Sequence, residues 1–170
     1  MQHAAAAIRE LSDAGLSSRE GCGNTVRNVT GDPWAGVCED EVFDLTPYAG
    51  AYVRYFVRHP TTQLMPRKIK TAFDGTPSED RSITGIHDIA FLAKVVDGVR
   101  GFEVRVGGGT SIMPRVAPTV WDFATADDGD VLLAEEEAVA GRAVGHAATG
   151  EPLLVGQVQL AVAGARRQDD

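Results

Sequence analysis

The sequence IHDIAFLAKVVDGVRGFEVRV, residues 86–106, decides the fold that we expect. Two runs rich in β-branched and aromatic residues flank Asp97-Gly98, a pair that favours tight hairpin turns. The connection would be longer if Val99 to Gly101 belonged to it. In the second run, GFEVRV, apolar and charged side chains alternate, as they do in a strand with one buried face. This stretch therefore predicts two paired strands.

Upstream, RKIKTAF follows Pro66 and predicts a further short strand. With a period of two, Lys68, Lys70 and Ala72 share one face of it, and apolar or hydroxyl side chains (Ile69, Thr71, Phe73) share the other. The two ammonium groups then project together. Two interpretations remain open: a solvated edge strand, whose lysines prevent pairing with another chain, or a cationic binding face.

A helix is predicted from Pro47 to Val57. Thr46 can cap its first turn, Pro47 suits the first helical position, and Pro60 ends the run. The aromatic residues fall at helical spacing and predict a stripe buried against the sheet: Tyr48, Tyr52, Tyr55 and Phe56.

Two segments precede this helix. Residues 4–14 are rich in alanine and predict a helix that Gly15 ends. Residues 16–37 sustain neither a helix nor a strand period, and we interpret them as a long functional loop because they carry Arg27 and Asn28. After the hairpin, Gly107–Gly109 would let the backbone approach a flat or anionic ligand closely.

Composition limits the function. A chain of 170 residues with 44% hydrophobic residues suits one ordinary domain, and it has neither a long apolar run nor a secretory pattern, so we expect a cytoplasmic protein that does not span a membrane. The net charge of -8 argues against nucleic acid as a partner. Yet the stretch from Leu45 to Phe73 has five basic residues and no acid, which suggests a locally held anion. Cys22 and Cys38 fit no metal-binding spacing.

The motifs GCGNTVRNVTGDP (21–33), LMPRKIK (64–70) and VGGG (106–109) resemble the sirohaem-binding part of ferredoxin-type nitrite and sulfite reductases. The likeness runs from about His3 to Phe123. It implies that the catalytic residues, which hold the anion, are Arg27, Lys68 and Lys70. It also implies that sirohaem lies near Asn28, Arg67, Gly107, Gly108 and Gly109. For His87 we expect a hydrogen-bonded structural role.

The resemblance implies an α+β fold, with a mixed or antiparallel sheet and flanking helices, in an incomplete sirohaem-domain-like unit. The expected parts are the end of a preceding ferredoxin-like half-domain (1–16), a truncated sirohaem-binding domain (17–126) and a divergent, poorly ordered tail (127–170). A helix over 131–144 would lie in that tail.

The activity that the resemblance implies is the six-electron reduction of nitrite to ammonia or of sulfite to sulfide. A redox cofactor must supply the electrons, here sirohaem and a 4Fe-4S cluster, with ferredoxin or a flavoprotein as donor. Because the cluster cysteines of the family have no match in this sequence, we expect a fragment that is inactive alone. The alternatives are a non-catalytic protein that binds sirohaem or an anion, and a truncated remnant.

Overall fold

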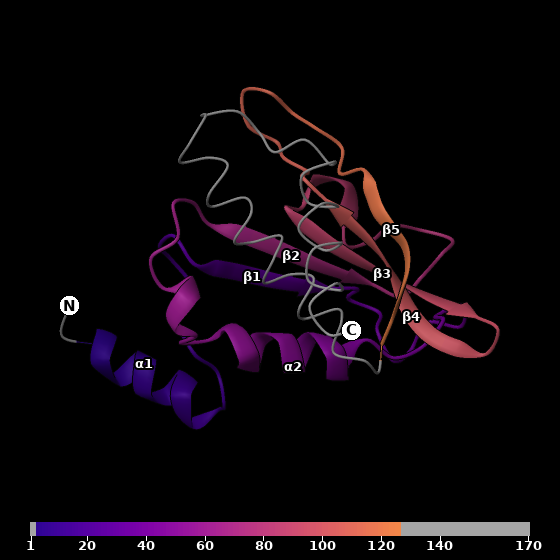
Figure 1. The fold of residues 1–170 in the computed structure, drawn as a ribbon. Coiled ribbons are helices and arrows are strands. Elements are labelled where there is room, and N and C mark those ends of the chain that lie inside the picture. Colours follow the sequence, from indigo (N-terminus) through magenta and orange to yellow (C-terminus); the bar gives the residue numbers. More distant parts are fainter. Residues whose placement is uncertain (1–2, 127–170) are drawn as a thin grey trace, which may run out of the picture.

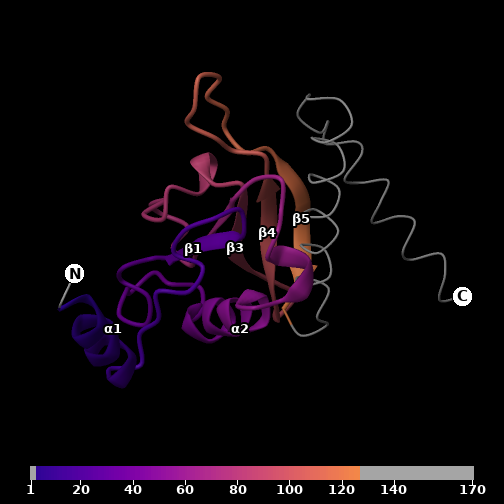
Figure 2. The same cartoon turned by 90° about the vertical axis from the view of Figure 1, so that its left-hand side faces the viewer.

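The protein is described here by a computed structural model, which places residues 3–126. The helix expected over 131–144 and the poorly ordered tail lie outside the described residues. The elements are α1 (Ala4–Asp13), β1 (Val26–Gly31), α2 (Thr46–Phe56), the short helix η1 (Pro60–Thr62), β2 (Ile69–Asp74), the short helix η2 (Thr84–Ile86), β3 (Ile89–Val96), β4 (Val99–Val106) and β5 (Thr119–Thr125). Helix α1 lies outside the sheet in both views (Figures 1 and 2).

The five strands form one mixed sheet in the order β1-β2-β3-β4-β5. β1, β2 and β3 run parallel, whereas β4 and β5 continue the sheet with antiparallel pairing. The turn between β3 and β4 contains only Asp97 and Gly98, both with positive φ (51° and 81°). These angles are those of a tight two-residue hairpin. The prediction of an α+β fold with a mixed sheet is therefore confirmed. The alternative of a longer connection that includes Val99 to Gly101 is wrong, because β4 begins at Val99.

Helix α2 covers one face of the sheet, as Figure 1 shows. Tyr52 and Phe56 of the helix are buried with Phe73 and Phe91 of the sheet, and the rings of Tyr52 and Phe73 meet edge-on at 5.7 Å. The Tyr52 hydroxyl also lies 2.8 Å from the Thr71 hydroxyl. Full burial of each such side chain contributes about 1.5–3 kcal/mol, so this aromatic layer is the main apolar support of the fold.

The opposite face of the sheet is partly covered by the connection from β2 to β3, residues 75–88. Ala72 and Ala90 are register partners on this face, and neither exposes any surface. Thr84 of the connection is fully buried and accepts a hydrogen bond from Arg105 of β4 (3.2 Å). Small side chains let this connection lie close to the strands.

The structure corrects three expectations. The segment interpreted as a long loop contains β1, whose pattern is broken by a register shift between Arg27 and Val29. Thr46 is the first residue of α2 rather than its cap, and its N–H instead bonds to the Asp44 carboxylate at 2.8 Å. Of the predicted aromatic stripe, Tyr52 and Phe56 are buried and Tyr48 is half-buried against the core, whereas Tyr55 is 38% exposed and its ring stacks on His59.

Candidate functional site

Basic side chains from two neighbouring strands gather at one end of the sheet. Arg27 of β1 and Lys70 of β2 are register partners, and Lys68 lies two residues before Lys70. Register partners of a parallel pair point to the same face. Since Val26 and Ile69 are buried toward α2, the three basic side chains belong to the opposite face. We call Arg27, Lys68 and Lys70 the basic wall.

The strand that carries the lysines is not at the edge of the sheet, because β1 flanks it on one side and β3 on the other. The edge-strand interpretation of Lys68 and Lys70 is therefore wrong. Lys70 is exposed and Lys68 is half-buried, while Arg67, just before them, is exposed. A central strand that carries Lys70, with Lys68 directly before it, is better suited to a binding surface.

Arg27 carries the most informative atom of the site. Its Nε is buried and has no hydrogen-bond partner within residues 3–126. An unsatisfied buried donor costs about 1–3 kcal/mol, more when it is charged, so native proteins seldom keep one without a purpose. The register shift places Asn28 as an extra residue directly after Arg27. Such bulges redirect side chains and occur often beside active sites. An anion that accepts from this guanidinium would remove the penalty.

The glycine loop joins the same end of the sheet. Gly107 follows β4, and its N–H donates to the main-chain oxygen of Asp88 at 2.8 Å. The Asp88 carboxylate in turn accepts from the N–H of Lys70 at 2.9 Å. One residue thus links the lysine strand to the glycine loop. Pattern analysis missed Asp88, although a carboxylate placed directly before a buried strand was a visible signal.

Gly107 and Gly108 require glycine for different reasons. Gly107 has a φ of +98°, which L side chains rarely adopt. A Cβ at Gly108 would lie 2.3 Å from the His87 oxygen and 2.6 Å from the Gly85 oxygen. At Gly109 a Cβ would meet nothing within 4 Å. The first two glycines therefore shape the loop against the protein, and the third leaves space open beside it.

His87 has partners at both ring nitrogens. Nδ1 lies 3.0 Å from the main-chain oxygen of Ile83, and Nε2 lies 3.2 Å from the hydroxyl of Thr30 on β1. Because a carbonyl can only accept, Nδ1 donates to the Ile83 oxygen, and Nε2 shares a hydrogen bond with the Thr30 hydroxyl. This agrees with the expected structural role, and it ties β1 to the turn below Gly108.

A second polar cluster follows the far end of β1. The buried Asp32 accepts from the Thr76 hydroxyl (2.7 Å), the Trp34 N–H (2.9 Å) and Arg81 (3.3 Å). Burial alone would raise the pKa of Asp32, but these hydrogen bonds and the Arg81 charge outweigh it and lower the pKa. Every group in this cluster is used to hold the loop, so we assign it a structural role.

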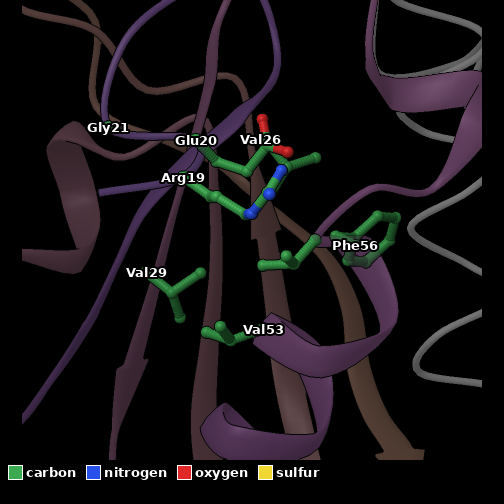
Figure 3. Close-up of a pocket in the computed structure, with 8 residues that line it drawn as sticks. Arg19, Glu20, Gly21, Val26, Val29, Val53 and Phe56 are labelled. Atoms are coloured by element: carbon green, nitrogen blue, oxygen red, sulfur yellow. The ribbon is translucent and has the colours of Figure 1, made fainter. Parts of the chain in front are cut away.

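A groove of about 240 Å³ lies on the α2 side of β1. Figure 3 shows that its apolar walls come from Val26 and Val29 of β1 and from Val53 and Phe56 of α2, with Arg19 at its rim. Because Val26 and Val29 point away from the basic wall, the groove is separate from the candidate site.

Residues 3–126 bring together no group of three or more histidine, cysteine or acidic side chains that could hold a metal ion. Cys22 is exposed, and Cys38 is half-buried, where it accepts from Arg81 at 3.2 Å. No helix in this part of the chain is long and apolar enough to cross a membrane.

The chain thus folds as an α+β domain with one mixed sheet, and the basic wall lies on one face at one end of that sheet. Residues 22–139 match the family model described as the nitrite and sulphite reductase 4Fe-4S domain. A ferredoxin sulfite reductase of Mycobacterium tuberculosis is 37% identical over 113 residues, which are 66% of this chain and 20% of that protein. An assimilatory ferredoxin-dependent nitrite reductase of Haloferax mediterranei is 35% identical over 133 residues, 75% of this chain and 21% of that protein.

Among solved structures, that of the Mycobacterium tuberculosis NirA protein superposes with a TM-score of 0.71 at 32% identity, covering 81% of this chain and 24% of that one. A dissimilatory sulfite reductase I structure, at 12% identity and a TM-score of 0.62, shares the fold. The chain belongs to the nitrite and sulfite reductase family. It spans about a fifth of the length of the curated relatives cited above.

Proposed function

We propose that this chain forms one wall of the sirohaem and anion pocket of a ferredoxin-dependent nitrite or sulfite reductase. The observation that carries the proposal is the buried Nε of Arg27, which finds no partner within residues 3–126 and lies on the face and at the end of the sheet that also present Lys68 and Lys70. Both the oxyanion substrates and the carboxylates of sirohaem are anionic, and either would supply the missing acceptor.

The three basic residues divide the work on chemical grounds. The guanidinium of Arg27 has a planar fork of donors that matches two oxygens of one oxyanion. Lys68 and Lys70 are compact point charges that neutralise the charge developing on those oxygens and hold protons at Nζ beside them. Asn28, Arg67 and the loop Gly107–Gly109 would contact the sirohaem periphery, where glycine permits a close approach of the backbone.

Sirohaem, coupled to a 4Fe-4S cluster in the whole enzyme, would supply the six electrons that no side chain can. The relatives carry ferredoxin, nitrite or sulfite in their names, and on this basis we propose ferredoxin as donor and one of the two anions as substrate. We further propose that the chain is a cytoplasmic fragment that does not turn over alone, because it spans only about a fifth of the length of the reductases it resembles.

Titration with sirohaem, followed by its Soret absorbance, tests the proposal. In the sirohaem-loaded chain, a double variant, Lys68→Gln with Lys70→Gln, should weaken the binding of sulfite at least about tenfold, because each close charge pair contributes on the order of 1 kcal/mol or more. The matched control, Arg54→Gln with Arg58→Gln, removes the same charge from two exposed positions within and just after α2 and should change binding less than about twofold. Equal loss in both variants, or no sirohaem binding by the wild-type chain, would refute the proposal.

A further inference from the structure

The basic wall and the glycine loop come from strands that do not touch each other, so something must fix the distance between them. β2 carries Lys70, β4 leads into Gly107, and β3 lies between these two strands. The β2–β3 ladder begins at the pair Thr71 and Ile89, so the N–H of Lys70 lies one residue before it. That N–H takes the Asp88 carboxylate as its acceptor at 2.9 Å.

Asp88 also bonds to the glycine loop. Its main-chain oxygen accepts from the N–H of Gly107 at 2.8 Å. A single residue at the start of β3 therefore bonds to both neighbouring components, with its side chain toward Lys70 and its backbone toward the loop.

The preceding residue completes the arrangement. His87 reaches Thr30 on β1, the strand that carries Arg27, through its Nε2. Its main-chain oxygen lies where a Cβ of Gly108 would collide with it, at 2.3 Å. The connection that ends in His87 and Asp88 thus touches β1, β2 and the glycine loop. A shift of Asp88 would move Lys70 and Gly107 relative to each other.

We infer that Asp88 is a positioning residue of this site, which fixes Lys70 and the glycine loop at the separation that an anionic ligand needs. The inference rests on the proposed function for the nature of the ligand. It does not make Asp88 a catalytic residue, because its carboxylate is used on a main-chain N–H.

Amide hydrogen exchange and a sulfite titration, both by NMR on the full chain, test the inference. In Asp88→Ala, exchange at the Lys70 amide should accelerate about tenfold, with a smaller rise at Gly107, and the Kd for sulfite should rise about tenfold, since hydrogen bonds to charged groups contribute that much or more. Asp88→Asn keeps an acceptor oxygen at the same place and should stay within about threefold of the wild type in exchange and affinity.

The matched control is Asp44→Ala. Asp44 also accepts a main-chain N–H at 2.8 Å, but at the start of α2, so its loss should leave the Lys70 amide and sulfite affinity unchanged. If Asp88→Ala does not fold, Asp88→Glu replaces it: the carboxylate is kept but displaced by one methylene, and the sulfite Kd should still rise.

A folded Asp88→Ala chain with wild-type exchange at Lys70 and wild-type sulfite affinity would overturn the inference. A wild-type chain without saturable sulfite binding would instead contradict the proposed function. In that case the exchange rates at the Lys70 and Gly107 amides would by themselves test whether Asp88 is a positioning residue.

Discussion

Three consecutive glycines should respond to the same substitution in three different ways. Gly107 needs its left-handed φ of +98°, Gly108 lies against the backbone of the turn below, and Gly109 has open space around it. Replacing each in turn with alanine adds one methyl group at neighbouring positions of one loop. Any difference among the variants therefore reports local geometry and not composition.

The magnitudes follow from the contacts. At Gly108 the new Cβ would lie 2.3, 2.6 and 2.8 Å from three main-chain atoms of residues 85–87, none of which can rotate away. Overpacking of this kind costs about 1–3 kcal/mol, and backbone neighbours favour the upper part of that range. At Gly107 the left-handed conformation costs about 1–2 kcal/mol. Alanine at Gly109 should be neutral or stabilise by up to about 1 kcal/mol, because it restricts the unfolded chain.

Urea unfolding measures all three. With a slope of about 1.5 kcal/mol per molar urea, Gly108→Ala should lower the midpoint by about 1–2 M, Gly107→Ala by about 1 M, and Gly109→Ala by nothing. The slope itself should not change. Equal urea midpoints for Gly108→Ala and Gly109→Ala would refute the close packing of Gly108 on the backbone of residues 85–87.

Further predictions concern single groups. Arg27→Met should raise the free energy of unfolding by about 1 kcal/mol, measured in urea, because it removes the unsatisfied Nε while keeping the stem; a loss of stability would mean that Nε has a partner. Asp32 has a lowered pKa in the folded chain, so its contribution to stability is present above about pH 4 and is lost as the pH falls through the folded-state pKa. Asp32→Asn should therefore flatten the dependence of the urea midpoint on pH between about pH 2 and 5, and an unchanged pH profile would contradict this. Tyr52→Phe should cost about 1–2 kcal/mol by leaving the Thr71 hydroxyl unpaired, and adding Thr71→Val should recover part of it in thermal unfolding; strict additivity would exclude the bond.

The antiparallel hairpin and the lysine strand were predictable because their signals are local. Asp97-Gly98 specifies a turn by its own conformational preferences, and the period of two around Lys70 separates two faces without any knowledge of partners. Burial of Ile69 and Phe73 follows directly from that period. These features carried the prediction of fold class.

β1 was not predictable in the same way. Its sequence VRNVTG breaks the period at Asn28, because the register shift puts Val26 and Val29 on the same face. A short strand with an irregularity owes its conformation to pairing with β2, which a single stretch of sequence does not reveal. The prediction that Thr46 caps α2 was wrong for a related reason. Thr46 and Asp44 both have side chains that can accept a hydrogen bond from a main-chain N–H, and only the folded backbone brings the Asp44 carboxylate to the N–H of Thr46.

For the site, residue types were predictable and their relations were not. Arg27, Lys68 and Lys70 were singled out from motifs, but the pairing of Arg27 with Lys70 depends on strand order. The buried state of the Arg27 Nε and the two bonds of Asp88 exist only in the folded chain. The roles of the basic wall toward an anion, and those of Asn28, Arg67 and Gly107–Gly109 toward sirohaem, stay predictions.

Chemical-shift mapping of the labelled chain during a titration with sulfite tests whether the basic wall and the glycine loop hold the anion. We expect saturable shifts that are largest at the amides of Arg27, Lys70 and Gly107, with little change along α2, and that shrink as salt screens the interaction. Shifts centred on the groove residues Val29 and Val53, or a folded chain that shows no saturable shifts at all, would contradict it.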